Sequence, residues 1–262
     1  MTNIVVLIKQ VPDTWSERKL ADGDFTLDRE AADAVLDEIN ERAVEEALQI
    51  KEAAGEGEVT VLCAGPARAT DAIRKALSMG ADKAIHIQDD LMHGSDAVQT
   101  AYVLASALGT VEGVEMVIAG NEATDGRTGA VPAMIAEYLE LPHLTHLRKL
   151  EVDGQTLRGE RETDDGIFAV EASLPAIVSV NEKINEPRFP SFKGIMAAKK
   201  KEVNVVSLAD LGVEADTVGL ANAGSTVTGV TPKAEKTAGE RVTDEGDGGT
   251  KVAEYLAAAK II

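Results

Sequence analysis

The residues best suited to bind a ligand form a glycine-containing stretch from Gly120 to Val131, which reads Gly-Asn-Glu-Ala-Thr-Asp-Gly-Arg-Thr-Gly-Ala-Val. It follows the apolar run Val117–Ala119 and leads into a predicted helix. Small residues expose backbone N–H groups, and the partial positive charge of a helix N-terminus favours a phosphate there. Arg127 could add a charge-assisted hydrogen bond. The same spacing also suits an ordinary turn between a strand and a helix, so the pattern alone leaves both interpretations open.

A second candidate is the basic segment from Lys183 to Lys201, which holds six cations and one anion in a chain of net charge −19. Two of the four phenylalanines of the chain, Phe189 and Phe192, lie in it. Its prolines favour an extended loop before a short helix. Exposed aromatic side chains on a projecting loop are typical anchors of protein–protein contacts. The alternative is that both rings cover the core and that the lysines are a solvated helix end.

Several catalytic motifs are absent from the sequence, among them the GxxxxGK[ST] phosphate loop and the GxSxG nucleophile elbow. His143 and His146 are three residues apart, but Pro142 and the extended pattern around them favour a loop, and no carboxylate cluster is adjacent. We therefore predict no metal site. The single cysteine, Cys63, lies in an apolar run and is predicted to be buried. These absences favour a binding or carrier protein that is not an enzyme and has no catalytic residues.

The composition narrows the classes of partner. With 262 residues and 44% hydrophobic residues, the chain can bury a sizeable core. Its 45 acidic against 26 basic residues argue against nucleic acid as the main partner. No apolar window is long enough for a membrane span, so we expect no direct membrane insertion. The first residues resemble a core strand rather than a targeting segment, which leads us to expect a cytoplasmic location.

The elements that position these candidates alternate along the first two thirds of the chain. Apolar runs predict strands at residues 4–8, 58–63, 84–87 and 114–119, and helical spacing predicts helices at residues 28–53, 67–79, 95–108 and 128–141. This alternation predicts an α/β fold with a mostly parallel, doubly wound sheet covered on both faces. Ligands of such sheets bind at the carboxyl ends of the strands, where Gly120 to Val131 begins.

The pattern changes after residue 147. Turns at Asp153-Gly154 and Asp164-Asp165-Gly166 predict an antiparallel hairpin region, and residues 175–180 form a predicted buried strand. From residue 215 the chain is too polar to fold alone, apart from helical spacing at residues 252–262. We predict an α/β nucleotide-binding domain at residues 1–214 and an extended C-terminal arm at residues 215–262. This arm is either disordered or, as we favour, docked on another protein.

Taken together, the sequence resembles the β-subunit family of the electron transfer flavoproteins over nearly its whole length. The combination of Asn-Glu-Pro-Arg with Gly-Ile-Met and a lysine run is highly specific for this family. The stretches that carry the resemblance are Val6–Asp13, Ala43–Leu48, Ala76–Asp82, Asp125–Val131, Arg161–Gly166 and Asn185–Lys201.

The resemblance implies a function in electron transport. In that family the β subunit forms a heterodimer with an α subunit that carries FAD, and its C-terminal arm wraps this partner. Acyl-CoA dehydrogenases of fatty acid β-oxidation and related flavoenzymes reduce the heterodimer, and a membrane-bound quinone oxidoreductase reoxidises it. The expected role of this chain is to bind a structural AMP and to support the FAD of the α subunit.

The resemblance also implies the AMP-binding residues. Arg127 and Ala130 depart from the common family loop Asp-Gly-Asp-Thr-Gly-Gln-Val, but neither change removes a backbone donor. Gly129 resembles the AMP-type loop more than the loop of members that hold a second FAD, so we predict AMP. The implied contacts are Leu7, Asn40, Ala64, Gly120, Asp125, Gly126, Arg127, Thr128, Gly129, Ala130 and Val131.

Further roles carried over from the family concern partners. Glu162 matches a carboxylate that pairs with an arginine of the mobile α-subunit flavin domain, and its alternative is a solvated hairpin position. Trp15 lies in the loop that approaches the flavin in the family, and burial in the subunit interface is an equal alternative. The segment that recognises dehydrogenases corresponds to Phe189, Phe192, Lys193, Ile195 and Met196, with Phe192 at the position of the anchoring leucine.

Two other classes compete with this interpretation. A stand-alone adenine-nucleotide-binding protein of the universal stress protein type shares the sheet topology, but it needs neither a long arm nor a basic aromatic loop. A nucleotide-dependent ligase or pyrophosphatase would need a pyrophosphate loop rich in serine and glycine after the first strand. Lys9–Asp13 is not such a loop.

Overall fold

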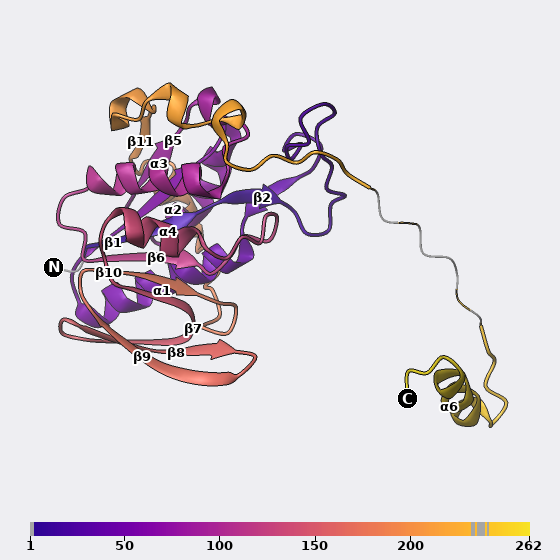
Figure 1. The fold of residues 1–262 in the computed structure, drawn as a ribbon. Helices are drawn as coiled ribbons and strands as arrows, with labels where there is room; N and C mark the ends of the chain where they lie inside the picture. Colours follow the sequence, from indigo (N-terminus) through magenta and orange to yellow (C-terminus); the bar gives the residue numbers. More distant parts are fainter. Residues whose placement is uncertain (1–2, 232–233, 235–238, 240) are drawn as a thin grey trace. The chain divides into compact units, whose positions relative to one another are not determined.

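The computed structural model describes residues 3–231, 234, 239 and 241–262 (Figure 1). The chain divides into two compact units, Met1–Thr228 and Gly229–Ile262. Residues 215–228, which the sequence analysis assigned to the arm, belong to the first unit, and Val218 is buried there. The described part of the second unit contains the helix α6 (Gly248–Ala258). Residues 232–233, 235–238 and 240 of the predicted arm lie outside the described residues.

A large sheet runs through the first unit, with nine strands counted over the described residues in the order β11-β5-β4-β1-β6-β10-β7-β8-β9. From β11 to β7 all neighbours are parallel, and β7, β8 and β9 are antiparallel. The predicted fold class, including the antiparallel hairpin region, is confirmed. The strands are β1 (Asn3–Ile8), β4 (Glu58–Ala64), β5 (Lys83–Ile87), β6 (Met116–Gly120), β7 (His143–Asp153), β8 (Thr156–Thr163), β9 (Gly166–Ser173), β10 (Ala176–Val180) and β11 (Val203–Val206).

Helices cover the sheet on both faces, as the alternating side chains of β1 show. Val6 packs in one core cluster with residues of α1 and α2, whereas Val5 packs in a second cluster with residues of α3 and α4. Successive side chains of a strand point to opposite faces, so a central strand that is apolar throughout needs a cover on each side. The helices are α1 (Glu38–Ala54), α2 (Thr70–Met79), α3 (Ala97–Gly109), α4 (Val131–Tyr138) and α5 (Phe192–Ala198).

The helix predicted at residues 28–53 begins ten residues later than the pattern indicates. The carboxylate of Asp37 accepts a hydrogen bond from the N–H of Ile39 at 2.9 Å and caps α1. Just before it, β3 (Ala34–Leu36) pairs antiparallel with β2 (Gln10–Pro12). Val35 fits the helical spacing but belongs to this small second sheet, and Ala31 lies in the bend before it.

The loop predicted around His143 and His146 is wrong, because both residues belong to β7. His143 pairs with Ile177 of β10, and His146 lies at an irregularity of that ladder with a positive φ of 59°. Pro142 directly precedes the strand, so it interrupts no hydrogen bond of the ladder. The remaining short elements are 3-10 turns at Ala67–Ala69, Asp90–Met92, Ala209–Leu211, Ala215–Thr217 and Leu220–Asn222.

Candidate functional site

A cavity of about 260 Å³ lies at the carboxyl ends of β1, β4 and β6. β4 and β6 are neighbours of β1 on opposite sides, so the strand order reverses direction at this point. Open α/β sheets bind their ligands at such a point. Nine predicted AMP contacts line the cavity, namely Leu7, Asn40, Ala64, Gly120, Gly126, Arg127, Thr128, Gly129 and Val131.

Helix α3 contributes a wall of the cavity that was not predicted from the sequence. Asp96 caps this helix, because its carboxylate accepts from the N–H of Gln99 at 3.0 Å and the Gln99 side chain accepts from the Asp96 N–H. The Asp-x-x-Gln spacing of this capping box is the signal that could have located the wall. Lining residues without a prediction are Ile8, Lys9, Ser95, Asp96, Ala97, Thr100, Leu104, Ala119, Asn121, Glu122, Ala123 and Pro132.

The loop between β6 and α4 forms a concave set of backbone donors. Arg127 and Gly129 adopt the left-handed conformation, with φ of 49° and 68°. The N–H of Arg127 donates to the carbonyl of Ala123 at 2.9 Å and closes the loop. Within the described residues, the N–H groups of Thr128, Gly129 and Ala130 have no protein acceptor. Free N–H groups at a helix N-terminus suit an anion such as a phosphate.

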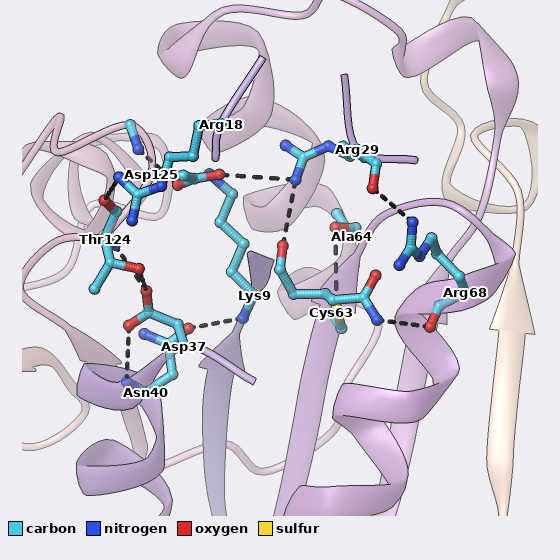
Figure 2. Close-up of polar contacts among 12 residues, drawn as sticks. Lys9, Arg18, Arg29, Asp37, Asn40, Cys63, Ala64, Arg68, Thr124 and Asp125 are labelled. Atoms are coloured by element: carbon cyan, nitrogen blue, oxygen red, sulfur yellow. Dashed lines mark hydrogen bonds and ion pairs between the residues drawn. The ribbon is translucent and has the colours of Figure 1, made fainter. Parts of the chain in front are cut away.

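Asp125 does not line the cavity but anchors the loop from behind (Figure 2). Its carboxylate accepts from Nζ of Lys9 at 2.7 Å and lies 3.7 Å from a guanidinium nitrogen of Arg29, and its side chain is 4% exposed. Burial favours the neutral form of Asp125, but the adjacent cations outweigh burial and leave the pKa of this carboxyl below its usual range. The carboxylate thereby holds the loop on β1, because Lys9 directly follows that strand.

Asp37 ties the same loop to α1. One carboxylate oxygen caps α1, and the other accepts from the N–H and the hydroxyl of Thr124 at 2.7 and 2.8 Å (Figure 2). Asn40, one turn into the helix, accepts from the N–H of Lys9 at 2.7 Å. A methyl group on Gly120 would lie 2.5 Å from Nδ2 of Asn40, so only glycine allows this close approach. These contacts fix both walls of the cavity before any ligand enters.

Asn121 offers a buried acceptor beside the cavity. Its Oδ1 atom is buried and has no hydrogen-bond partner among the described residues. Its Nδ2 atom lies 3.4 Å from Nδ1 of His146. Buried polar atoms in native proteins almost always have a partner, so an unpaired one in a cavity wall indicates a ligand or a water. The donor set and the free acceptor together fit a nucleotide.

Arg127 and Ala130 differ in their relation to the cavity. The Arg127 side chain lines it and forms an exposed ion pair with Glu122 at 3.2 Å, so the guanidinium is already close to the loop donors. Ala130 does not line the cavity and is the residue that precedes α4. Their predicted phosphate contacts stay predictions.

The basic segment presents its aromatic side chains to solvent. Phe189 is 95% exposed and Phe192 is 80% exposed, so the alternative that both rings cover the core is wrong. Ile195 and Met196 are about half exposed, on the same short helix α5. Lys193 is exposed beside them. An exposed apolar cluster of this size is unusual on a lone surface and is typical of a protein contact.

Glu162, on β8, is paired within the chain. Its carboxylate accepts from Nζ of Lys183 at 2.7 Å and lies 3.8 Å from Arg148. The hydrogen bond from Lys183 lowers the pKa of Glu162. Trp15 is 95% exposed on the loop after β2, and Arg18 of that loop donates to the carbonyl of Thr124 at 2.9 Å. The loop that carries Trp15 therefore touches the loop of the cavity.

The described residues include no helix with the length and apolar character needed to span a membrane. They also hold no group of three or more histidine, cysteine, aspartate or glutamate side chains arranged for a metal ion.

Comparisons with known proteins identify the family. A family model described as an electron transfer flavoprotein domain matches residues 24–211. The chain is 76% identical to electron transfer flavoprotein subunit beta of Mycobacterium bovis and 74% identical to that of Mycobacterium leprae, each over the full length of both chains. It is 40% identical to the subunit beta of Thermoanaerobacterium thermosaccharolyticum over 91% of both chains. The chain therefore belongs to the β-subunit family of the electron transfer flavoproteins.

Proposed function

We propose that this chain pairs with an α subunit, binds AMP in the cavity at the ends of β1, β4 and β6, and supports the FAD of its partner. The observation that supports AMP most strongly is the row of unpaired N–H groups at Thr128, Gly129 and Ala130 beside a cavity of about 260 Å³. This volume lies just below the range of about 300–1,000 Å³ that is typical of ligand pockets.

The chemistry of the lining supports one orientation of the nucleotide. The loop donors and Arg127 would hold the phosphate. Apolar lining residues such as Leu7, Ala64 and Leu104 would contact the base. We expect AMP in this place to be a structural ligand rather than a substrate.

We further propose that acyl-CoA dehydrogenases reduce the heterodimer and that a quinone oxidoreductase reoxidises it. The redox chemistry is supplied by the FAD of the α subunit, and this chain contributes surfaces. Phe189, Phe192, Lys193, Ile195 and Met196 form an exposed apolar and basic cluster suited to docking a dehydrogenase. Residues 229–262 would complete the contact with the α subunit.

Glu162 is proposed to bias the position of the α-subunit flavin domain. An arginine from that domain would have to compete with Lys183, which already donates to Glu162 at 2.7 Å. An exposed ion pair contributes little free energy. Pairing of Glu162 with Lys183 and pairing with the α-subunit arginine should therefore be similarly populated. Such a balance suits a domain that moves between docking and electron transfer.

Co-expression with the α subunit tests the proposal. We expect a stable heterodimer whose flavin absorbance is bleached by a purified acyl-CoA dehydrogenase and its acyl-CoA substrate. Reoxidation should follow when a quinone oxidoreductase and a quinone are added. A chain that remains monomeric with the α subunit, or a heterodimer that no acyl-CoA dehydrogenase reduces, would contradict the proposal.

A further inference from the structure

Arg188 joins the exposed aromatic segment to helix α1 through two carboxylates. Its Nε donates to Glu45 at 2.7 Å, and a terminal nitrogen donates to Glu45 and to Glu52 at 3.1 Å each. The backbone N–H of Arg188 also donates to Glu45, at 3.2 Å. One guanidinium therefore bridges two acidic residues seven positions apart, which lie on the same face of the helix. We call this group the Arg188 clamp.

The Arg188 guanidinium compensates the negative charges of Glu45 and Glu52. Glu45 is nearly buried, with 6% of its side chain exposed. Burial favours its neutral form, but the hydrogen bonds from Arg188 and Gln49 outweigh burial and lower the pKa of Glu45. The hydrogen bond from Arg188 also lowers the pKa of Glu52. In return, Glu52 and Glu45 raise the pKa of Arg188. Removing Arg188 would leave two repelling carboxylates, one of them buried.

Contacts on either side of Arg188 hold the segment further. Asn185 donates from Nδ2 to Glu46 at 2.9 Å, and Arg74 of α2 donates to the carbonyl of Ala198 at 2.6 Å. Gly194 packs so closely on α2 that a methyl group there would lie 2.4 Å from the carbonyl oxygen of Ser78. The backbone is thus attached before, within and after the aromatic cluster, while Phe189 and Phe192 stay exposed.

The lysines of the segment differ in their contacts. Lys183 donates to Glu162 at 2.7 Å, and Lys201 is turned inward and donates to the carbonyl of Leu77 at 3.1 Å. Lys193, Lys199 and Lys200 are exposed and have no ion pair within the part of the chain that the structure describes. Three free cations beside four exposed apolar side chains fit a partner that has an apolar pocket with carboxylates on its rim.

We propose that Arg188 is a positioning residue that pre-organises this docking surface, and that the surface selects dehydrogenases whose apolar pocket has an acidic rim. The inference rests on the proposed function, because it names how the same surface recognises its electron donor. A loop held in its bound conformation loses less entropy on binding. The clamp therefore raises affinity without contacting the partner.

The test uses the complete heterodimer and steady-state reduction by a purified acyl-CoA dehydrogenase. For Arg188→Ala we expect an increase of about tenfold in the KM for the heterodimer, with kcat within about twofold of wild type. Arg188→Lys should recover little, because an ammonium cannot bridge both carboxylates. Arg158→Ala is the matched control, since Arg158 also joins two carboxylates, Asp153 and Glu171, at 3.1 and 2.8 Å, outside the segment.

A double-mutant cycle shows whether Arg188 acts through the aromatic cluster. Phe192→Ala should cost much less in the Arg188→Ala background than in wild type, since a loose loop has already lost the benefit of the anchor. Raising the salt concentration should raise the KM of the wild type. An unchanged KM for Arg188→Ala, additive effects in the cycle, or a KM independent of salt would overturn the inference.

The outcomes separate the inference from the proposed function. A wild-type heterodimer that no acyl-CoA dehydrogenase reduces contradicts both, because the partner itself would be wrong. A wild type that is reduced normally, together with an Arg188→Ala variant that folds and shows an unchanged KM, contradicts the inference alone. Thermal unfolding of each variant establishes that the fold is kept.

Discussion

The cavity at the strand ends and the segment around Phe192 use charge in opposite ways. In the cavity, the partly buried ion pair of Lys9 with Asp125 holds a backbone loop and leaves backbone donors unpaired for a ligand. In the segment, the Arg188 clamp holds the backbone and leaves apolar side chains uncovered. In both regions, ion pairs hold the backbone and leave one set of groups without a partner in the chain. Unpaired N–H groups in the cavity suit the phosphate of a nucleotide, whereas exposed apolar side chains in the segment suit a protein partner.

We expect the largest effect on stability from Asp37, which joins α1 to the cavity loop. Asp37→Ala removes the cap of α1 and leaves Thr124 without its acceptor, so we expect a loss of about 3 kcal/mol in the free energy of unfolding. Urea unfolding of the heterodimer measures it. Asp71→Ala is the control, because Asp71 is exposed in the first turn of α2, has no side-chain hydrogen bond or ion pair within the described residues, and should change little. Equal effects of the two substitutions would refute the role of Asp37.

A second substitution breaks the cavity without removing a charge. Gly120→Ala places a methyl group against Asn40, which must move, so we expect the affinity for AMP to fall by at least about tenfold. Calorimetric titration of nucleotide-depleted protein with AMP measures the change. Gly109→Ala has open space around it and should bind AMP like the wild type. Unchanged binding by Gly120→Ala would place the nucleotide elsewhere.

The exposed segment should respond in activity but not in stability. Phe192→Ala removes a ring that is 80% exposed, so the unfolding free energy should stay within about 0.5 kcal/mol of wild type. Reduction by a dehydrogenase should weaken by about tenfold in kcat/KM. Val205→Ala, an exposed position on β11, serves as the control. If Phe192→Ala leaves dehydrogenase-dependent reduction unchanged, the anchor role must be abandoned.

The ion pair behind the cavity loop makes a pH-dependent contribution. The pKa of Asp125 is lower in the folded than in the unfolded chain, so its stabilisation is complete above the unfolded value of about 4. It is lost as the pH falls through the lower folded value. We expect Asp125→Asn to cost about 1–2 kcal/mol at pH 7 and progressively less below about pH 4. A difference between wild type and variant that grows towards acid would contradict this sign.

The smallest effect concerns Cys63. Burial raises the pKa of this thiol to about 12, so it should not react with a thiol reagent at neutral pH in the native protein. Dithionitrobenzoate should label this cysteine only after urea is added. Rapid labelling of Cys63 in the folded chain would show that the strand β4 is open to solvent.

The central strands of the sheet were predicted from the sequence more accurately than the boundaries of the helices between them. Runs such as Ile4–Ile8 are apolar on both faces, so they identify central parallel strands without any knowledge of their neighbours. The start of α1 was missed because helical spacing continues into β3, although Asp37, which caps the helix through the N–H of Ile39, is a local signal for its start. A second contact joins Asp37 to Thr124 of the cavity loop. That contact joins residues 87 positions apart, which no local pattern reveals.

The candidate sites show the same limit. The loop from Gly120 to Val131 was located by its glycines and its place after a strand, which are local features. Lys9 was missed, because its role depends on Asp125, 116 positions along the chain. Arg188 was counted among the cations of an exposed segment, yet its charge is directed at α1. Local sequence thus predicts which segments matter, whereas the fold decides which charges remain free.

The most direct test of the account is the nucleotide content of the purified heterodimer. Denaturation followed by chromatography should release one AMP and one FAD for each heterodimer, and Gly120→Ala should reduce the AMP while the FAD remains. Two FAD and no AMP for each heterodimer would contradict the central claim that this cavity holds a structural mononucleotide.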